Sequence, residues 1–123
     1  MTVQVGDIFW HTVYYRNGAM ETRPVVIFKI KNSQAIAAYA TITGSSIKNV
    51  EGKYDKWKVP IFKWATAGLE KGSYVKVNCY AYIPISMFES KKIKDYIGQM
   101  DQIDFNNVIQ KIEEFVKSGE TPW

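Results

Sequence analysis

The stretch ETRPVVIF, residues 21–28, gives the strongest indication of the fold. Pro24 lacks a backbone donor and favours an extended conformation at the residue before it, so the stretch predicts the start of a buried strand and not a helix. Arginine is scarce, because only Arg16 and Arg23 stand against many lysines. A guanidinium fixed at the rim of a sheet can hold a phosphate through two parallel hydrogen bonds. A solvated arginine at a strand end is the alternative, and this stretch alone does not decide between them.

Length and composition limit the class of protein. The 123 residues suffice for one domain spanning residues 1–123, and 46% hydrophobic content is typical of a globular protein. The net charge of +4 is compatible with a polyanionic partner. Cys79 is the only cysteine and no signal peptide is recognisable, which favours a reducing cytoplasm. We find no apolar run of membrane-spanning length, no Cys/His metal cluster and no nucleotide-binding glycine motif.

Segments rich in β-branched and aromatic residues alternate with turn signals. They predict strands over residues 5–15, 24–30, 35–43, 56–61 and 73–83. Near the C-terminus the apolar residues recur at helical spacing, which predicts a helix that Asp101 begins and Gly119 ends. This order predicts a mainly β (α+β) fold, a small, partly closed antiparallel barrel with one C-terminal helix.

Two of these strands combine polar and aromatic side chains on one face. Strict alternation predicts that one face of each strand packs in the core and the other points outward. The outward residues are Tyr39, Thr41 and Thr43 on one strand, and Tyr74, Lys76, Asn78, Tyr80 and Tyr82 on the other. Such a face suits single-stranded nucleic acid, because bases stack on the rings and the cation meets phosphate. A solvated sheet face whose tyrosines pack on neighbours explains the same pattern, so both interpretations stand.

Three further residues are interpreted as structural or are left without a role. An unperturbed histidine has a pKa near neutrality, so His11 could act as a general base, but it shares a strand face with Phe9 and Val13 and a packed histidine is the better interpretation. Cys79 lies on the inward face of its strand and is expected to be a small buried hydrophobe. Trp123 is not needed for any core and receives no role.

Several short motifs follow one another along the chain. They are GDIFW at residues 6–10, RPVV at 23–26, ATIT at 40–43, AGL at 67–69, SYVKV at 73–77 and GQMD at 98–101. The ordered set resembles the PemK/MazF-like toxins of bacterial type II toxin–antitoxin systems and spans nearly the whole chain. RPVV is similar to the family's Arg-Pro strand start, and ATIT to its next strand, which ends at a threonine.

This resemblance implies a single PemK/MazF-like domain with a small SH3-like (CcdB/MazF-like) barrel, working as a cytoplasmic homodimer. The family cleaves single-stranded RNA without a metal or cofactor, by attack of the 2′-hydroxyl on the adjacent phosphate, and a protein antitoxin blocks the groove. By position, Arg23 and Thr43 form the implied catalytic pair, with Arg23 stabilising the pentavalent phosphate and Thr43 bonding a phosphate oxygen. The candidate RNA-binding residues are Lys76, Asn78, Tyr80, Tyr39 and Thr41.

The chain also departs from the family pattern. Some relatives carry an arginine and an aspartate where this chain has Lys76 and Asn78. Lysine keeps the charge without the guanidinium fork, and asparagine cannot serve as a carboxylate base. The loop over residues 16–22 is also short beside the family's. The alternative function is therefore a non-catalytic module on the same barrel, binding nucleic acid or a protein such as a gyrase subunit.

Overall fold

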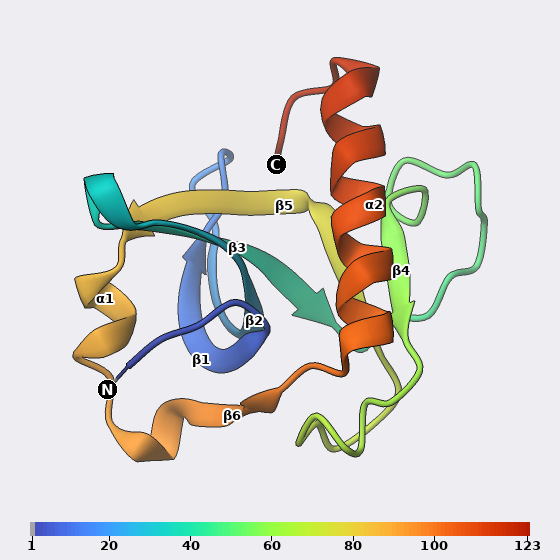
Figure 1. Ribbon diagram of the computed structural model, residues 1–123. Coiled ribbons are helices and arrows are strands. Elements are labelled where there is room, and N and C mark those ends of the chain that lie inside the picture. The colour runs from blue at the N-terminus through green and yellow to red at the C-terminus, as the bar shows by residue number, and fades with distance from the viewer. Residues whose placement is uncertain (1) are drawn as a thin grey trace.

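A curved, six-stranded antiparallel sheet with a long helix packed beside it forms the core of the computed structural model, which describes residues 2–123 (Figure 1). The strand order is β4-β5-β3-β2-β1-β6. The elements are β1 (Asp7–Tyr14), β2 (Met20–Lys31), η1 (Asn32–Gln34), β3 (Ile36–Thr43), β4 (Lys58–Ile61), β5 (Ser73–Pro84), α1 (Ser86–Glu89), η2 (Ile93–Asp95), β6 (Tyr96–Gln99) and α2 (Gln102–Ser118). The predicted class, mainly β with a C-terminal helix, is confirmed.

β1 and β2 form a hairpin closed by a tight turn at the predicted position. The Tyr15 amide donates to the Ala19 carbonyl at 2.9 Å, and Gly18 has a φ of +89°, which glycine adopts without strain. β2 begins at Met20, earlier than predicted, so Pro24 lies inside the strand. At Pro24 only β1 pairs with β2, and the recorded pairing with β3 begins at Val25. A strand tolerates proline where one side is unpaired.

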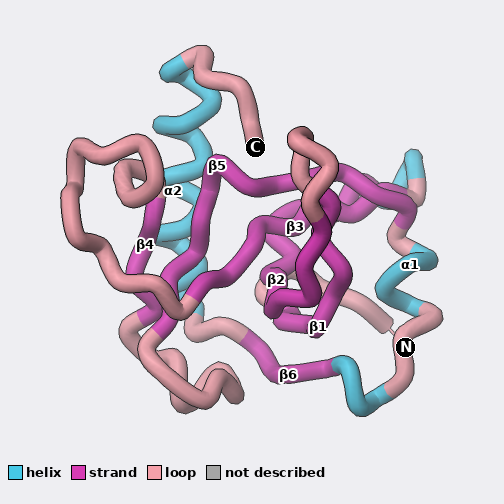
Figure 2. Tube along the Cα trace, turned by 180° about the vertical axis from the view of Figure 1, so that it is seen from behind, coloured by secondary structure: helices cyan, strands magenta, loops and turns pink. Residues whose placement is uncertain are grey.

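The sheet carries a hydrophobic core on each face. One core, here called the α2 core, joins the strands to the long helix; its members include Val26, Phe28, Ala40, Ile42, Val75, Val77, Val108, Ile112 and Phe115. The other, the α1 core, includes Val3, Phe9, Val13, Val25, Ile27, Tyr39 and Phe88. β2 and β3 lie in the middle of the sheet (Figure 2). Because both strands contribute to both cores, their central residues are buried on both faces. The buried strand predicted from residues 21–28 is confirmed.

The outward face predicted for β3 is not an open surface. Tyr39 is 4% exposed and Thr41 is 2% exposed. Phe88 of α1 and Val3 of the N-terminal segment cover the sheet beside Tyr39. Alternation along the strand separates the two faces correctly, but it cannot show that a later segment of the chain covers the second face.

β5 is strongly irregular in its middle. One step along β3, from Ala40 to Thr41, corresponds to four steps along β5, from Tyr80 to Lys76. The extra residues 77–79 bend the strand, as Figure 1 shows, and change which side chains face each core. Val75 and Val77 lie in the α2 core, whereas Ala81 and Ile83 pack against the α1 core. The prediction of one continuous apolar face along β5 is therefore wrong.

Helix α2 begins and ends where the sequence predicts. The Asp101 carboxylate accepts a hydrogen bond from the Ile103 amide at 3.0 Å, and Gly119 closes the helix with a φ of +76°. Asp104, in the first turn, is 1% exposed and accepts hydrogen bonds from the Phe62 and Lys63 amides at 3.1 and 2.9 Å. These bonds attach the start of the helix to the end of β4.

Three short elements between β5 and α2, namely α1, η2 and β6, were not predicted from the sequence. α1 places Phe88 in the α1 core, and β6 adds a sixth strand beside β1. At β6, a Cβ on Gly98 would lie 2.2 Å from the Ala67 carbonyl oxygen, so only glycine allows this close approach. None of the helices in the described residues is long and apolar enough to span a membrane.

Candidate functional site

The ends of β2, β3 and β5 bring the predicted catalytic residues together on one face of the sheet. Thr41 of β3 pairs with Val25 of β2 and with Lys76 of β5. Extended by two residues beyond the recorded pairs, the same β2–β3 register sets Arg23 opposite Thr43, and both side chains line the same surface hollows. Residues two apart on a strand share a face, so Arg23, Thr43 and Lys76 point to the same side as Thr41.

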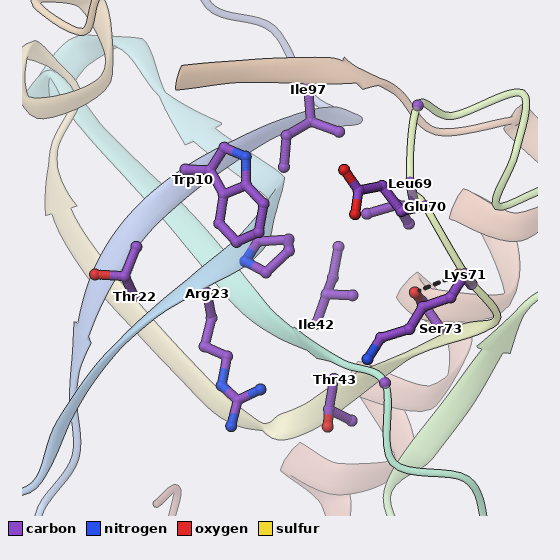
Figure 3. A pocket seen from close by; sticks show the side chains of 13 residues that line it. Trp10, Thr22, Arg23, Ile42, Thr43, Leu69, Glu70, Lys71, Ser73 and Ile97 are labelled. Atoms are coloured by element: carbon purple, nitrogen blue, oxygen red, sulfur yellow. Dashed lines mark hydrogen bonds between the residues drawn. The ribbon is translucent and has the colours of Figure 1, made fainter. Parts of the chain in front are cut away.

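Arg23 and Thr43 stand between two surface hollows and line both of them. The first, here called the Trp10 hollow, has a volume of about 230 Å³ and is bordered by Trp10, Leu69 and Ile97 (Figure 3). The second, the Trp123 hollow, has a volume of about 420 Å³. Its lining residues are Tyr15, Asn17, Ala19, Glu21, Arg23, Thr41, Thr43, Ser45, Tyr54, Lys58, Lys76 and Trp123. A linear polymer that extends from one hollow into the other would pass both predicted catalytic residues.

Arg23 is held by a neighbour on its own strand. Its Nε donates to Glu21 Oε2 at 2.6 Å, and its Nη2 forms a salt bridge with the same oxygen. Both side chains remain about two-fifths exposed, at 41% and 45%. The guanidinium is therefore oriented and still accessible from the Trp123 hollow. Glu21 was not predicted as a site residue, although its spacing of two from Arg23 on a strand would have placed both on one face.

Thr43 presents a hydroxyl group that is partly satisfied already. Its Oγ1 accepts a hydrogen bond from the Ser45 amide at 3.2 Å, which leaves its own hydrogen to donate. Thr41, in the same hollow, has a buried Oγ1 with no hydrogen-bond partner among the described residues. Buried hydroxyl groups are nearly always hydrogen-bonded, so Thr41 Oγ1 is an exception to that rule within the site.

Lys76 extends from β5 into the same hollow. Its Nζ lies 4.8 Å from the centre of the Trp123 ring, within the range of a cation–π contact. Asn78 is only 2% exposed, and its carbonyl accepts a hydrogen bond from the Trp123 amide at 2.7 Å. Asn78 thus lies beneath the tail of the chain, while Lys76 lines the hollow.

The two tyrosines predicted to bind RNA lie elsewhere. Tyr39 packs in the α1 core against His11 and Phe88, with ring centres 5.2 and 6.1 Å away. Tyr80 packs edge-on against Phe28 and Phe115 in the α2 core, each 6.0 Å away. Neither tyrosine lines the Trp123 hollow. The bend in β5 explains the position of Tyr80, because beyond it the even-numbered residues change sides.

Lys71 is a further cation that the sequence did not single out. Its side chain lies against Gly44, where an added Cβ would be 2.5 Å from Lys71 Cε, and Figure 3 shows its amine directed toward Thr43. Lys71 and Lys76 thus lie beside the predicted catalytic pair, Arg23 and Thr43, in different hollows. Within residues 2–123, no three His, Cys, Asp or Glu side chains gather closely enough to hold a metal ion.

His11 lies outside this site. It is 8% exposed in the α1 core, and its Nδ1 has no hydrogen-bond partner among the described residues. Burial, reinforced by the positive charge of Lys91, lowers the pKa of His11 to about 4, so the ring is neutral at physiological pH. The interpretation of His11 as a packed histidine is confirmed. Cys79 is likewise buried, and burial raises its thiol pKa, which fits the predicted small hydrophobe.

Known proteins match this chain in structure but not in sequence searches. No family model matches the sequence, and no curated protein matches it. Among solved structures, the Mycobacterium tuberculosis toxin MazF-mt6 is similar over 95% of this chain and 99% of its own, with a TM-score of 0.60 and 18% identity. The MazE-MazF structure from Deinococcus radiodurans covers 95% and 98%, with a TM-score of 0.65 and 10% identity.

An Mtb toxin covers 85% of this chain and 98% of its own, with a TM-score of 0.51 and 19% identity. All three sequence identities are low, so the similarity is one of fold. It extends over nearly the full length of each matched structure. The chain therefore has the fold of the MazF toxins, as the resemblance in its sequence predicts.

Proposed function

We propose that this protein is an endoribonuclease toxin that cleaves single-stranded RNA without a metal ion. The observation that carries the proposal is the meeting of Arg23, Thr43 and Glu21 where two hollows join. Arg23 and Thr43 occupy the positions that the family resemblance assigns to catalysis, and the likeness to MazF structures supports that assignment.

The three side chains suit an attack by the 2′-hydroxyl on the adjacent phosphate. A bond forms between the 2′ oxygen and phosphorus, and the bond from phosphorus to the 5′ oxygen breaks. The Glu21 carboxylate takes the 2′-hydroxyl proton, and the leaving 5′ oxygen gains a proton from solvent. Arg23 donates to the phosphate oxygens as charge builds on them, and Thr43 donates its hydroxyl hydrogen to one of them. The products are a 2′,3′-cyclic phosphate and a 5′-hydroxyl.

Charge around the site favours a polyanionic substrate. Lys71 lines the Trp10 hollow and Lys76 the Trp123 hollow, so the RNA backbone meets a cation on each side of the scissile phosphate. These lysines act as point charges and do not select a base. The net charge of +4 adds long-range attraction.

A protein antitoxin and a second copy of the chain are the partners that accompany this proposal. The MazE-MazF structure supports an antitoxin for a protein of this fold. A tail of such a partner could lie across the Trp123 hollow and cover Arg23 and Lys76, which would block access to RNA.

The direct test is to incubate the purified protein with mixed-sequence single-stranded RNA in EDTA and to determine the chemistry of the new ends. We expect 5′-hydroxyl ends and 2′,3′-cyclic phosphates. Arg23→Ala should cut at least about 100-fold more slowly, as when one donor to a developing oxyanion is removed. Lys29→Ala removes a positive charge from an exposed position on the same strand and should cut like the parent.

Two results would contradict the proposal. Cleavage by Arg23→Ala at the parent's rate would remove the assigned site. RNA binding without any cleavage would instead support the non-catalytic binding module.

A further inference from the structure

The C-terminal tail builds an aromatic corner beside the catalytic pair. The rings of Tyr54 and Trp123 lie 5.4 Å apart at an interplanar angle of 89°. Tyr54 is 59% exposed and Trp123 is 37% exposed, and both line the hollow that contains Arg23 and Thr43. Two perpendicular rings suit a planar ligand, because its face can stack on one ring while its edge meets the other.

Cations flank the corner on both sides. Lys53 Nζ lies 4.9 Å from the centre of the Tyr54 ring, and Lys76 Nζ lies 4.8 Å from the centre of the Trp123 ring. Each ring of the corner therefore has a cation within 4.9 Å of its centre. Rings for bases alternating with charges for phosphates are the pattern that single-stranded nucleic-acid sites use.

The corner is held in place by hydrogen bonds on each side. The Trp123 amide donates to the Asn78 carbonyl at 2.7 Å, and the Arg16 amide donates to the Trp123 carbonyl at 3.2 Å. Asn78 lies in the irregular part of β5, where its carbonyl has no partner on β3 and can accept the tail. On the other side, Asp55 accepts hydrogen bonds from the Lys48 and Asn49 amides and from Lys58 Nζ, which fixes the loop next to Tyr54.

We infer that Trp123 and Tyr54 form a base-binding subsite that stacks one nucleobase next to the scissile phosphate. The Trp123 hollow, at about 420 Å³, stays open with the tail in this position, so Trp123 acts as a wall of the site. The inference rests on the proposed function in taking RNA as the ligand, and it requires no cleavage. It assigns a role to a residue that the sequence pattern leaves unexplained.

Binding of non-cleavable oligonucleotides separates base stacking from phosphate contact. The probes are fluorescein-labelled 2′-O-methyl hexamers of adenosine, cytidine and uridine, with an abasic hexamer of equal charge as reference. Fluorescence anisotropy should show that the parent binds base-bearing hexamers more tightly than the abasic one. Trp123→Ala should weaken base-bearing hexamers about 5- to 150-fold, the range for losing one stacked base, and change the abasic one little.

Three variants complete the experiment. Trp123→Phe keeps a ring and should retain much of the affinity, and a urea midpoint equal to the parent's shows that the fold of each variant is intact. Lys76→Ala should weaken base-bearing and abasic hexamers alike and flatten the salt dependence, because it removes a phosphate contact. Phe62→Ala removes an aromatic ring that is 71% exposed and lines neither hollow, so its binding should be unchanged.

The outcomes distinguish the inference from the proposed function. Equal weakening of all hexamers by Trp123→Ala, unchanged binding, or no base preference in the parent overturns the subsite. Tighter binding by Trp123→Ala also overturns it, and would make the tail a cover over the groove. A base-dependent loss in a protein that cleaves no RNA overturns the proposed nuclease function and leaves the subsite standing.

Discussion

A salt bridge links Glu21, the candidate general base, to Arg23, the residue proposed to stabilise negative charge on the phosphate. One Glu21 oxygen accepts both contacts from the guanidinium, so the second oxygen is the one directed to other partners. A phosphate arriving at Arg23 must share or replace this carboxylate. Glu21 therefore either accepts the proton of the 2′-hydroxyl or serves only to orient Arg23, and these two roles differ in their pH dependence.

The variant Glu21→Gln separates the two roles. Glutamine keeps an oxygen that can accept from Arg23 but cannot take a proton. If Glu21 is the base, the cleavage rate should fall about 100- to 10,000-fold, and the pH–rate profile should lose its acidic limb. A variant with nearly the parent's rate and an unchanged profile would restrict Glu21 to orienting Arg23.

His11 makes stability depend on pH even though it takes no part in the site. Its pKa falls from 6.5 to about 4 on folding, so the unfolded chain binds a proton in that pH range and the folded chain does not. Stability is therefore complete above pH 6.5 and decreases as the pH falls toward 4, by up to about 3 kcal/mol.

Replacing the ring tests this prediction. His11→Phe keeps an aromatic ring in the α1 core and removes the titration. In urea unfolding, the variant should gain stability relative to the parent between pH 6.5 and 4 and show no relative gain between pH 7 and 8. A constant difference across the whole range would show that His11 does not titrate as its burial implies.

At the residue scale, the resemblance carried by the RPVV and ATIT motifs singles out Arg23 and Thr43. The structure has both lining the same two hollows, and their catalytic role stays a prediction. Tyr39 was expected on an outward face because its strand alternates, but α1, which the sequence did not predict, covers that face. Trp123 could not be placed, since its position depends on a carbonyl freed by the bend in β5.

Among the elements, α2 depends on Asp104 for its attachment to the sheet. This residue is 1% exposed, and its carboxylate accepts hydrogen bonds from the two backbone amides that directly follow β4. Asp104→Ala leaves both amides without a partner and should lower the free energy of unfolding by roughly 2–4 kcal/mol. Asp104→Asn keeps one accepting oxygen and should lose less. Equal losses in urea unfolding would show that the two bonds contribute little.

Element positions followed well from local signals, and element faces followed less well. The five predicted strands and the C-terminal helix exist, because turn residues and capping residues act locally. β6 escaped prediction because it is only four residues long and has no alternation of its own. The face assignments on β5 failed because a bulge depends on pairing with β3, which is not encoded in the strand itself.

At the scale of the whole molecule, a homodimer remains a prediction. A groove for several nucleotides is difficult to build on one small barrel, and a two-fold dimer would supply it. The helix over residues 102–117 and the strands near it are candidates for the contact between the two copies. Val108, Ile112 and Phe115 are already buried in the α2 core, so the helix can contribute only its remaining exposed residues.

Sedimentation equilibrium at micromolar concentration checks this directly. We expect about twice the chain mass of 14.1 kDa, with a dissociation constant at or below the micromolar range typical of specific interfaces. A monomer that still cleaves RNA in EDTA would contradict the dimer and leave the catalytic assignment intact.

The anchoring of Trp123 also affects how the protein should be prepared. Any residue fused after Trp123 starts at the rim of the hollow that holds Arg23 and Lys76, whereas the beginning of the described chain lies near α1 (Figure 1). A tag attached directly after Trp123 would thus lie where the proposed RNA ligand binds, or displace the indole from its carbonyl anchor. In tests of the proposed function, inactivity of such a preparation would not distinguish an inactive site from a blocked one.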